Sequence, residues 1–347
     1  MTIPRLRSAA AALALLAAVV VPAQPAAAAP ASYVALGDSY SSGTGTRAYL
    51  ADGTTCQRSV HAFPALIASA KGYALDFRAC SGATVADVAA AQLGALTPST
   101  SFVSVSVGGN DAAFAAVLTE CAKPAWMSNC TAAIDRAQAV ITGQLPGRLG
   151  SLYGQIRARA PQASVTVAGY PRIFNGEDCN AATWFSPTEE ARLNATADLL
   201  NRTTAAAATA AGFTFRDPTT AFTGHAVCDD VEWLNGLASP ISDSYHPNRS
   251  GHAVGYVPLI GPALTGAPVA VTTATVQAAE LSGPALARDQ RAHAAQDARI
   301  VPERFVLPDL TSAAARAAAA RAGVDLSDAA SIARADRAAG ALQESRR

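Results

Sequence analysis

From residue 33 to residue 264, short apolar runs alternate with longer stretches of helical character. The runs are rich in β-branched or aromatic residues and lie at 33–37, 74–79, 102–107, 164–168 and 213–216. Stretches of helix-like length and composition lie at 61–71, 85–93, 131–145, 149–160 and 187–211. Strands and helices that alternate in this way typically form a parallel sheet with helices on both faces. The sequence therefore predicts an α/β fold, a three-layer α/β/α sandwich with a central parallel sheet.

Local signals predict the ends of two helices. Ser186 and Pro187 open the 187–211 helix as its N-cap and first-turn proline. Residues 248–264 are expected to form a closing helix, which Pro258 should end or kink early because proline lacks an N–H. Long loops separate these elements and are expected to carry a functional site at one rim of the sheet.

A serine follows the first apolar run, and a histidine follows an aspartate near the end of this framework. Ser39 comes directly after Gly37 and Asp38, and the stretch 243–247 reads DSYHP, which supplies Asp243 and His246. The carboxyl end of a strand is where an open α/β sheet places its chemistry, and a histidine can take the proton of a serine hydroxyl. This pairing predicts a hydrolase.

Two further blocks lie between these, each at the end of a strand-like run. The stretch CSGAT contains Gly82, and VSVGGND contains Asn110. Taken alone, Gly82 would fit a turn and Asn110 a helix N-cap. With Ser39, Gly82, Asn110 and His246 in this order, the chain resembles the SGNH (GDSL-type) hydrolases, in particular the secreted bacterial lipases and esterases with three disulfides. The resemblance covers roughly residues 33–265 and implies a flavodoxin-like sandwich.

The resemblance assigns a role to each of these residues. Ser39 is the expected nucleophile and His246 its general base. Asp243 is the expected partner of the histidine, although some secreted relatives use a main-chain carbonyl instead. The backbone amides of Ser39 and Gly82 and the side-chain amide of Asn110 are expected to form the oxyanion hole, because pre-aimed donors stabilise the charge of the tetrahedral intermediate. No metal or other cofactor is expected.

The first 28 residues have the pattern of a secretory signal peptide. A basic start precedes an apolar run from Ala9 to Val21 and an alanine stretch at 26–29. This run of about 13 residues is shorter than the roughly 18 that a membrane-spanning helix needs. We therefore expect a secreted, extracellular protein.

Export would favour disulfide formation among the six cysteines. Free buried thiols or a metal site are the alternatives, but the cysteines and histidines lack zinc-site spacing. The resemblance implies pairing between neighbours, namely Cys56 with Cys80, Cys121 with Cys130, and Cys179 with Cys228.

The balance of charged residues bears on which partners this chain could bind. Lys plus Arg and Asp plus Glu each total 26, which argues against a nucleic-acid surface. We expect a monomer that binds a small-molecule or lipid ester and makes transient contact with lipid interfaces.

Residues 269–347 are rich in alanine with few bulky side chains, which predicts a loosely attached extension, helical or partly disordered. The expected units are a signal peptide at 1–28, a hydrolase domain at 29–268 and this extension.

The sequence thus predicts a secreted serine hydrolase that cleaves carboxylic, mainly fatty-acyl, esters through an acyl-enzyme. Lipase, esterase, phospholipase A1 and thioesterase activities share this chemistry and differ in the shape of the acyl pocket. Two alternatives stay open: a carbohydrate or acetyl esterase of the same fold, and a non-catalytic secreted binding module. A binding module would be expected to have lost one of the blocks around Ser39, Gly82, Asn110 and His246, all of which this chain contains.

Overall fold

The computed structural model describes Met1 and residues 29–345, so the predicted signal peptide lies outside the described residues apart from Met1. Five parallel strands form a sheet in the order β2-β1-β3-β4-β5. The strands are β1 (Ser32–Gly37), β2 (Ala74–Phe77), β3 (Phe102–Ser106), β4 (Ser164–Ala168) and β5 (Thr214–Arg216). This order is the flavodoxin-like one, and the predicted sandwich is confirmed.

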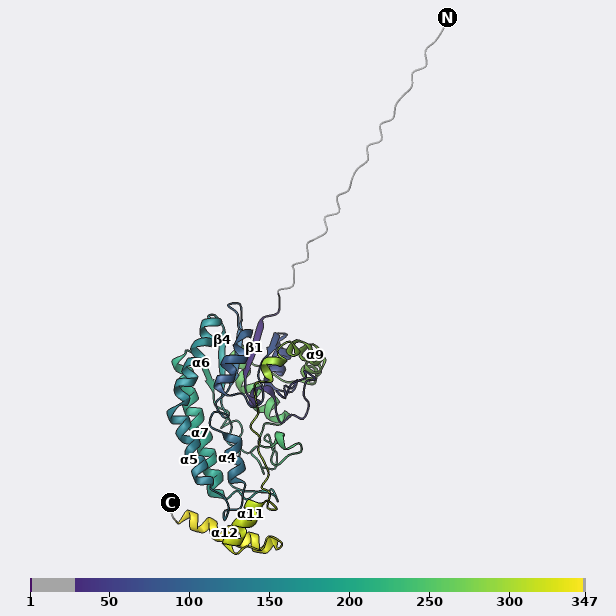
Figure 1. Cartoon of the computed structure of the whole chain (residues 1–347). Helices are drawn as coiled ribbons and strands as arrows, with labels where there is room; N and C mark the ends of the chain where they lie inside the picture. The colour runs from purple at the N-terminus through teal and green to yellow at the C-terminus, as the bar shows by residue number, and fades with distance from the viewer. Residues whose placement is uncertain (2–28, 346–347) are drawn as a thin grey trace.

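Helices cover both faces of the sheet (Figure 1). One layer consists of α2 (Phe63–Lys71), α8 (Val257–Thr265) and α9 (Thr273–Arg291). The other contains η1 (Val88–Gln92), α6 (Leu145–Arg159) and α7 (Pro187–Ala210), with α5 (Cys130–Gly143) packed on α6 and α7 and α4 (Phe114–Cys121) packed on α5. The shorter or peripheral elements are α1 (Ser39–Ser42), α3 (Val85–Asp87), η2 (Leu93–Ala95), η3 (Ile241–Asp243), η4 (Gly251–Tyr256), α10 (Ala294–Asp297), α11 (Ala313–Ala322) and α12 (Ala329–Glu344).

The central strands are buried between the helix layers, which explains their apolar composition. The hydroxyl groups of Tyr33 and Ser104 satisfy each other at 2.7 Å within this core. At the end of β1, Gly37 has φ +120°, and a Cβ there would lie 2.2 Å from the Ser106 carbonyl oxygen. Glycine is therefore required where β1 turns beside β3 into α1, the helix that begins with Ser39.

The predicted N-cap of α7 is confirmed, whereas the predicted early stop at Pro258 is not found. Ser186 caps α7 by accepting a hydrogen bond from the Glu189 amide, with Pro187 in the first turn. Pro258, however, does not end the closing helix, which continues through α8 to Thr265. The preceding segment η4 is a π-helix, and Val257 donates to the His252 carbonyl five residues back. This wider turn makes room for the proline ring, which then lies in the first turn of α8.

The three disulfides pair neighbouring cysteines, as the resemblance implied. Cys56 is bonded to Cys80, Cys121 to Cys130 and Cys179 to Cys228. They fasten long loops to the layers around the sheet, and each bridge of this kind typically stabilises a protein by about 2 to 4 kcal/mol.

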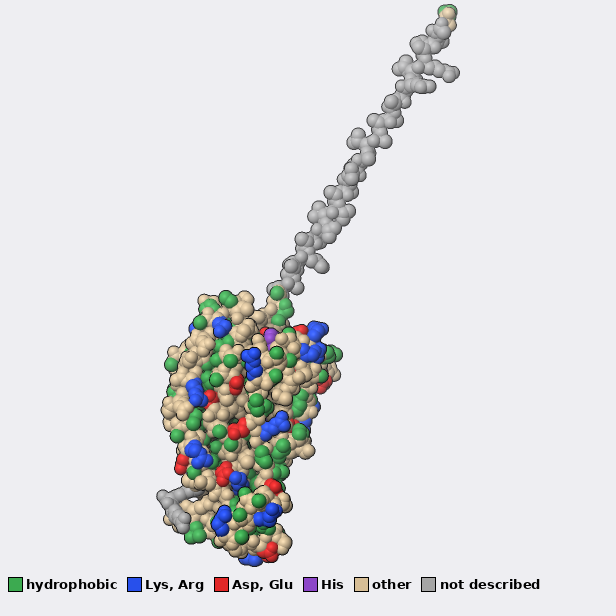
Figure 2. Space-filling model, in the orientation of Figure 1, with side chains coloured by type: hydrophobic (Ala, Val, Ile, Leu, Met, Phe, Trp, Pro, Cys, Tyr) green, Lys and Arg blue, Asp and Glu red, His purple; other side chains and the backbone are tan. Residues whose placement is uncertain are grey.

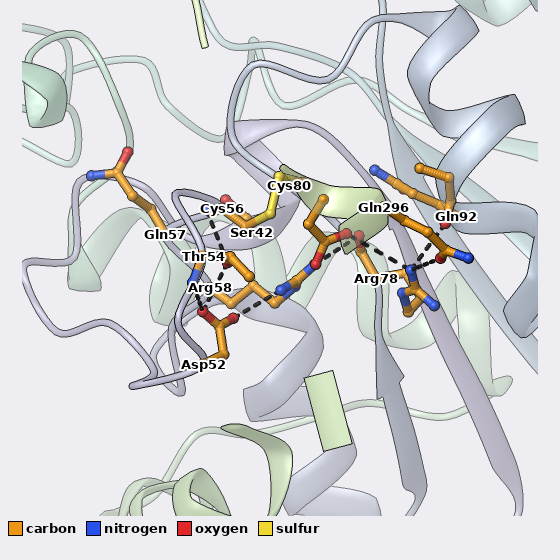
Figure 3. Close-up of a disulfide and its surroundings, with 12 residues drawn as sticks. Ser42, Asp52, Thr54, Cys56, Gln57, Arg58, Arg78, Cys80, Gln92 and Gln296 are labelled. Atoms are coloured by element: carbon orange, nitrogen blue, oxygen red, sulfur yellow. Dashed lines mark hydrogen bonds and ion pairs between the residues drawn. A yellow bond between two sulfur atoms is a disulfide. The ribbon is translucent and has the colours of Figure 1, made fainter. Parts of the chain in front are cut away.

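Residues after 268 are packed on the preceding part of the chain, which corrects the expected loose attachment. Helix α9 contacts α2 and β2. Beyond it, the buried carboxylate of Asp297 bonds Arg58 at 2.7 Å and lies 3.8 Å from Arg78. Figure 3 shows Arg58 also reaching Asp52, beside the Cys56–Cys80 disulfide. The attachment uses buried charges, which a count of bulky apolar residues does not detect.

The last two helices, α11 and α12, form a pair beyond the ends of α4, α5 and α7 (Figure 1). Ala319, Val324 and Ile332 form a small apolar cluster with Trp126 and Trp184 of the hydrolase domain. The backbone of Ala125 donates to Asp336 and accepts from Gln343. This contact fixes the far end of the extension as well.

The described surface carries charges of both signs. Figure 2 shows Lys and Arg side chains interspersed with Asp and Glu across the visible face. No helix within residues 29–345 is long and apolar enough to cross a membrane.

Candidate active site

The structure brings Ser39 and His246 together at the carboxyl edge of the sheet. Ser39 is the first residue of α1, directly after β1, and His246 lies in the loop that follows η3. The Ser39 Oγ atom lies 2.9 Å from Nε2 of His246, across 207 residues of sequence. This is the contact that activation of a serine by a histidine requires.

The backbone of His246 is held in place by Asn235. The Asn235 amide donates to the His246 carbonyl at 2.9 Å, and the Asn235 side chain donates to the carbonyls of His246, Asp243 and Gly45. The ring of Tyr40 lies beside the imidazole, with centroids 5.4 Å apart. The loop therefore presents the histidine in a fixed orientation.

The second ring nitrogen of His246 defines its tautomer. Nδ1 lies 2.9 Å from the main-chain carbonyl oxygen of Ser244. Because a carbonyl can only accept, Nδ1 carries the proton, and Nε2 presents a lone pair to the Ser39 hydroxyl. Burial lowers the pKa of His246, whereas the Ser244 carbonyl and the charge of Asp243 raise it. A lowered pKa keeps the imidazole neutral, the state that a base needs.

Asp243 does not make the hydrogen bond to His246 that was expected of it. Its Oδ1 accepts from the hydroxyl of Tyr49 at 2.6 Å, and its Oδ2 is buried without a partner among the described residues. The Ser244 carbonyl takes the orienting position, which is the open alternative from the sequence. Asp243 acts on the histidine only through its charge.

Replacing Asp243 by asparagine should lower kcat by less than about tenfold, far below the loss of a triad carboxylate. Asparagine keeps an acceptor for Tyr49 but removes the charge that raises the pKa of His246. The acidic limb of the kcat/KM profile should therefore move to lower pH, since the neutral base persists further into acid. A loss of a hundredfold or more without this shift would return the orienting role to the carboxylate.

The residues that carry the predicted oxyanion donors, Ser39, Gly82 and Asn110, line one pocket together with His246. The Ser39 amide lies at the start of α1, and Gly82 adopts φ +86° in the loop after β2. Within residues 29–345, neither amide donates to a protein acceptor. Asn110 donates through Nδ2 to the Ala83 carbonyl at 3.0 Å, leaving its second N–H for a ligand. Asn110 does not cap α4, whose N-cap is Ala113.

Asp38, the residue before the nucleophile, links the block around Ser39 to the block around Asn110. Its buried carboxylate accepts from the Tyr40 amide at 3.0 Å, which caps α1, and from the Tyr170 hydroxyl. The Tyr170 hydroxyl in turn accepts from the Gly109 amide at 3.3 Å, next to Asn110. Burial raises the pKa of Asp38 to about 7. Asp38 therefore positions the Ser39 turn relative to the Asn110 loop.

An apolar pocket opens beside Ser39 and runs between α4, α5 and α7. Its apolar lining includes Phe114, Leu118, Ile141, Ile173 and Leu200. Residues 302–305 of the extension line the same pocket. No sequence pattern pointed to these four residues. Pockets with apolar walls and few polar groups at one end suit a hydrocarbon chain with a polar reacting group.

Comparison with known proteins places this geometry in a family. A model of the GDSL-like lipase/acylhydrolase family matches residues 35–254, more than half of the chain. The chain belongs to this family. A lipase of Streptomyces rimosus is 43% identical over 233 residues, which make up 67% of this chain and 86% of the relative. Lipase 1 of Streptomyces coelicolor is 44% identical over 241 residues, 69% of this chain and 88% of the relative.

Solved structures agree with this assignment. The extracellular lipase of Streptomyces rimosus aligns with TM-score 0.63 and 42% identity, over 67% of this chain and 99% of its own. The phospholipase A1 of Streptomyces albidoflavus aligns with TM-score 0.63 and 43% identity, over 67% of this chain and 98% of its own. The chain is a carboxylic ester hydrolase, and about a third of it has no counterpart in these two structures.

Proposed function

We propose that this protein is a secreted serine hydrolase of fatty-acyl esters, with Ser39 as nucleophile and His246 as base. The observation that carries the proposal is the 2.9 Å contact between Ser39 Oγ and His246 Nε2 at the mouth of an apolar pocket. The oxyanion donors would be the amides of Ser39 and Gly82 and the side chain of Asn110.

In the acylation step, Ser39 Oγ attacks the ester carbonyl carbon while its proton passes to Nε2 of His246. The Ser244 carbonyl holds the Nδ1 proton of the resulting imidazolium, and the nearby charge of Asp243 stabilises it. The imidazolium then protonates the alkoxide leaving group, the C–O bond breaks, and the acyl group stays on Ser39.

In the deacylation step, water replaces the departed alcohol beside His246. Nε2 takes a proton from the water as its oxygen attacks the acyl carbon, and the donors again face the oxyanion. The proton on Nε2 then passes to Ser39 Oγ as the acyl–oxygen bond breaks. The acid leaves and the resting hydroxyl is restored.

The pocket lining favours fatty-acyl chains over sugar acetates. Phe114, Leu118, Ile141 and Leu200 offer apolar contact, whereas recognition of a sugar needs several polar groups. The relatives named lipase and phospholipase A1 support the same choice.

A series of p-nitrophenyl esters from acetate to palmitate, with a phospholipid alongside, tests this proposal. Burying a methylene contributes about 0.8 kcal/mol, so kcat/KM should rise by at least about tenfold from acetate to hexanoate. A profile that is highest at acetate, together with release of acetate from acetylated xylan, would favour the carbohydrate esterase instead.

We propose that residues 1–28 direct secretion and that residues 29–268 form the catalytic domain, with 269–347 as an attached extension. The extracellular lipase among the solved relatives supports secretion. We also propose that the protein acts as a monomer that contacts lipid interfaces only transiently.

A further inference from the structure

An extended segment of the extension crosses the active-site pocket. Residues 300–306, here called the strap, lie between α10 and α11 without regular secondary structure. Four of them, 302–305, line the same pocket as Ser39 and His246. Ile300 and Phe305 are buried, whereas Val301 is 81% exposed. Ser39, in the same pocket, is 7% exposed.

The strap contacts the loops that carry the reacting groups. Pro302 packs directly on Gly82, where a Cβ would lie 2.3 Å from the Pro302 Cα. The ring of Phe305 meets Tyr245, the residue before His246, edge-on with centroids 4.9 Å apart. Gly82 can therefore carry no side chain while the strap is in place.

The strap also bonds the opposite side of the pocket. The Val306 amide donates to Thr119 Oγ1 on α4 at 2.9 Å. The strap thus bridges from the oxyanion loop to α4, across the space that leads to the apolar walls.

Both ends of the strap are anchored. On one side, the buried ion pair of Asp297 with Arg58 holds the chain. On the other, α11 and α12 pack on Trp126 and Trp184 and bond the backbone of Ala125. A segment held at both ends opens by local loosening and not by swinging away.

We propose that the strap is a size filter that limits hydrolysis of bulky lipid esters by this site. The inference rests on the proposed function. The family match ends at residue 254, before the strap, and the two solved relatives align over nearly their whole length without a third of this chain. The strap therefore lies beyond the part of the chain that matches the family, and it lines the pocket that holds the catalytic groups. Small esters reach Ser39 beneath it, and a two-chain phospholipid does not.

The test measures kcat/KM of full-length variants for two substrates, dioleoyl phosphatidylcholine in mixed micelles and p-nitrophenyl butyrate. The quantity compared between variants is the ratio of the phospholipid value to the butyrate value. Phe305→Ala removes the contact with Tyr245, and this ratio should rise at least about tenfold as access opens to the larger substrate. Thr119→Val loosens the strap from the α4 side without altering the strap itself, and the ratio should shift in the same direction. Val301→Ala, a change at an exposed position of the same segment, is the matched control and should leave the ratio unchanged.

An unchanged or lowered ratio in both Phe305→Ala and Thr119→Val would overturn the inference, because the strap would then be inert or part of the binding wall. If Phe305→Ala fails to fold, the ratio measured for Thr119→Val decides: a raised ratio supports the filter, and an unchanged or lowered ratio overturns it. The rates of inactivation by a small and a bulky p-nitrophenyl phosphonate give a second readout that needs no turnover. In Phe305→Ala and Thr119→Val, the rate of inactivation by the bulky reagent should rise more than the rate of inactivation by the small one. A native protein that hydrolyses no ester would instead refute the proposed function, and is thereby distinguished from failure of the filter alone.

Discussion

Replacing Ser39 by alanine should reduce ester hydrolysis to below about one per cent of the native rate, because loss of a nucleophile usually costs several orders of magnitude. No other hydroxyl bonds Nε2 of His246 among the described residues, so no neighbour can take over the attack. The measurement is kcat/KM for p-nitrophenyl butyrate, with the circular dichroism spectrum as a check of folding.

Ser81→Ala is the matched control for this variant. The Ser81 side chain lines the same pocket but does not bond His246, so its removal should cost far less activity. Retention of more than about one per cent of activity by Ser39→Ala would assign the nucleophile to another group. The non-catalytic binding module would show no activity in any variant.

Replacing Asn110 by alanine should lower kcat by roughly 10² to 10³ with little change in KM. The amide donor is needed mainly when charge develops on the oxyanion, so ground-state binding is spared. Loss of the bond to the Ala83 carbonyl should reduce the free energy of unfolding by only about 1 kcal/mol.

Asn175→Ala provides the control, because Asn175 is exposed and bonds Asp229 away from the pocket. Its kcat should match that of the native protein. If Asn110→Ala kept the native kcat, the oxyanion would be stabilised by the backbone amides of Ser39 and Gly82 alone. If Asn110→Ala raised KM with kcat unchanged, Asn110 would bind substrate without stabilising the transition state.

The sequence could predict most of the sheet because parallel strands are buried on both faces. The run at 164–168 coincides with β4, and the run at 33–37 falls one residue short of β1. Capping at Ser186 was equally readable, since its signal is local. The continuation of the helix past Pro258 was not, because it depends on a π-helical turn that no residue type announces.

The residues around the reacting centre were predictable from the sequence, whereas the main-chain partner of His246 was not. Ser39, Gly82, Asn110 and His246 could be named from four short blocks, and the structure gathers them around one pocket. The partner of His246 is the Ser244 carbonyl, an atom that any residue supplies, so the sequence left a main-chain partner open beside Asp243 but could not say which carbonyl it is. The position of the strap in the pocket could not be predicted from the sequence either. It depends on the tertiary contacts of Asp297 on one side and of α11 and α12 on the other.

Covalent labelling with a phosphonate can identify the nucleophile of this site. A small p-nitrophenyl alkylphosphonate is attacked by an activated serine, which forms a stable oxygen–phosphorus bond and releases p-nitrophenol. We expect the native chain to gain a single phosphonyl group, peptide mapping to place this group on Ser39, and Ser39→Ala to gain none. A phosphonyl group on any other residue, or equal labelling of Ser39→Ala, would contradict this expectation.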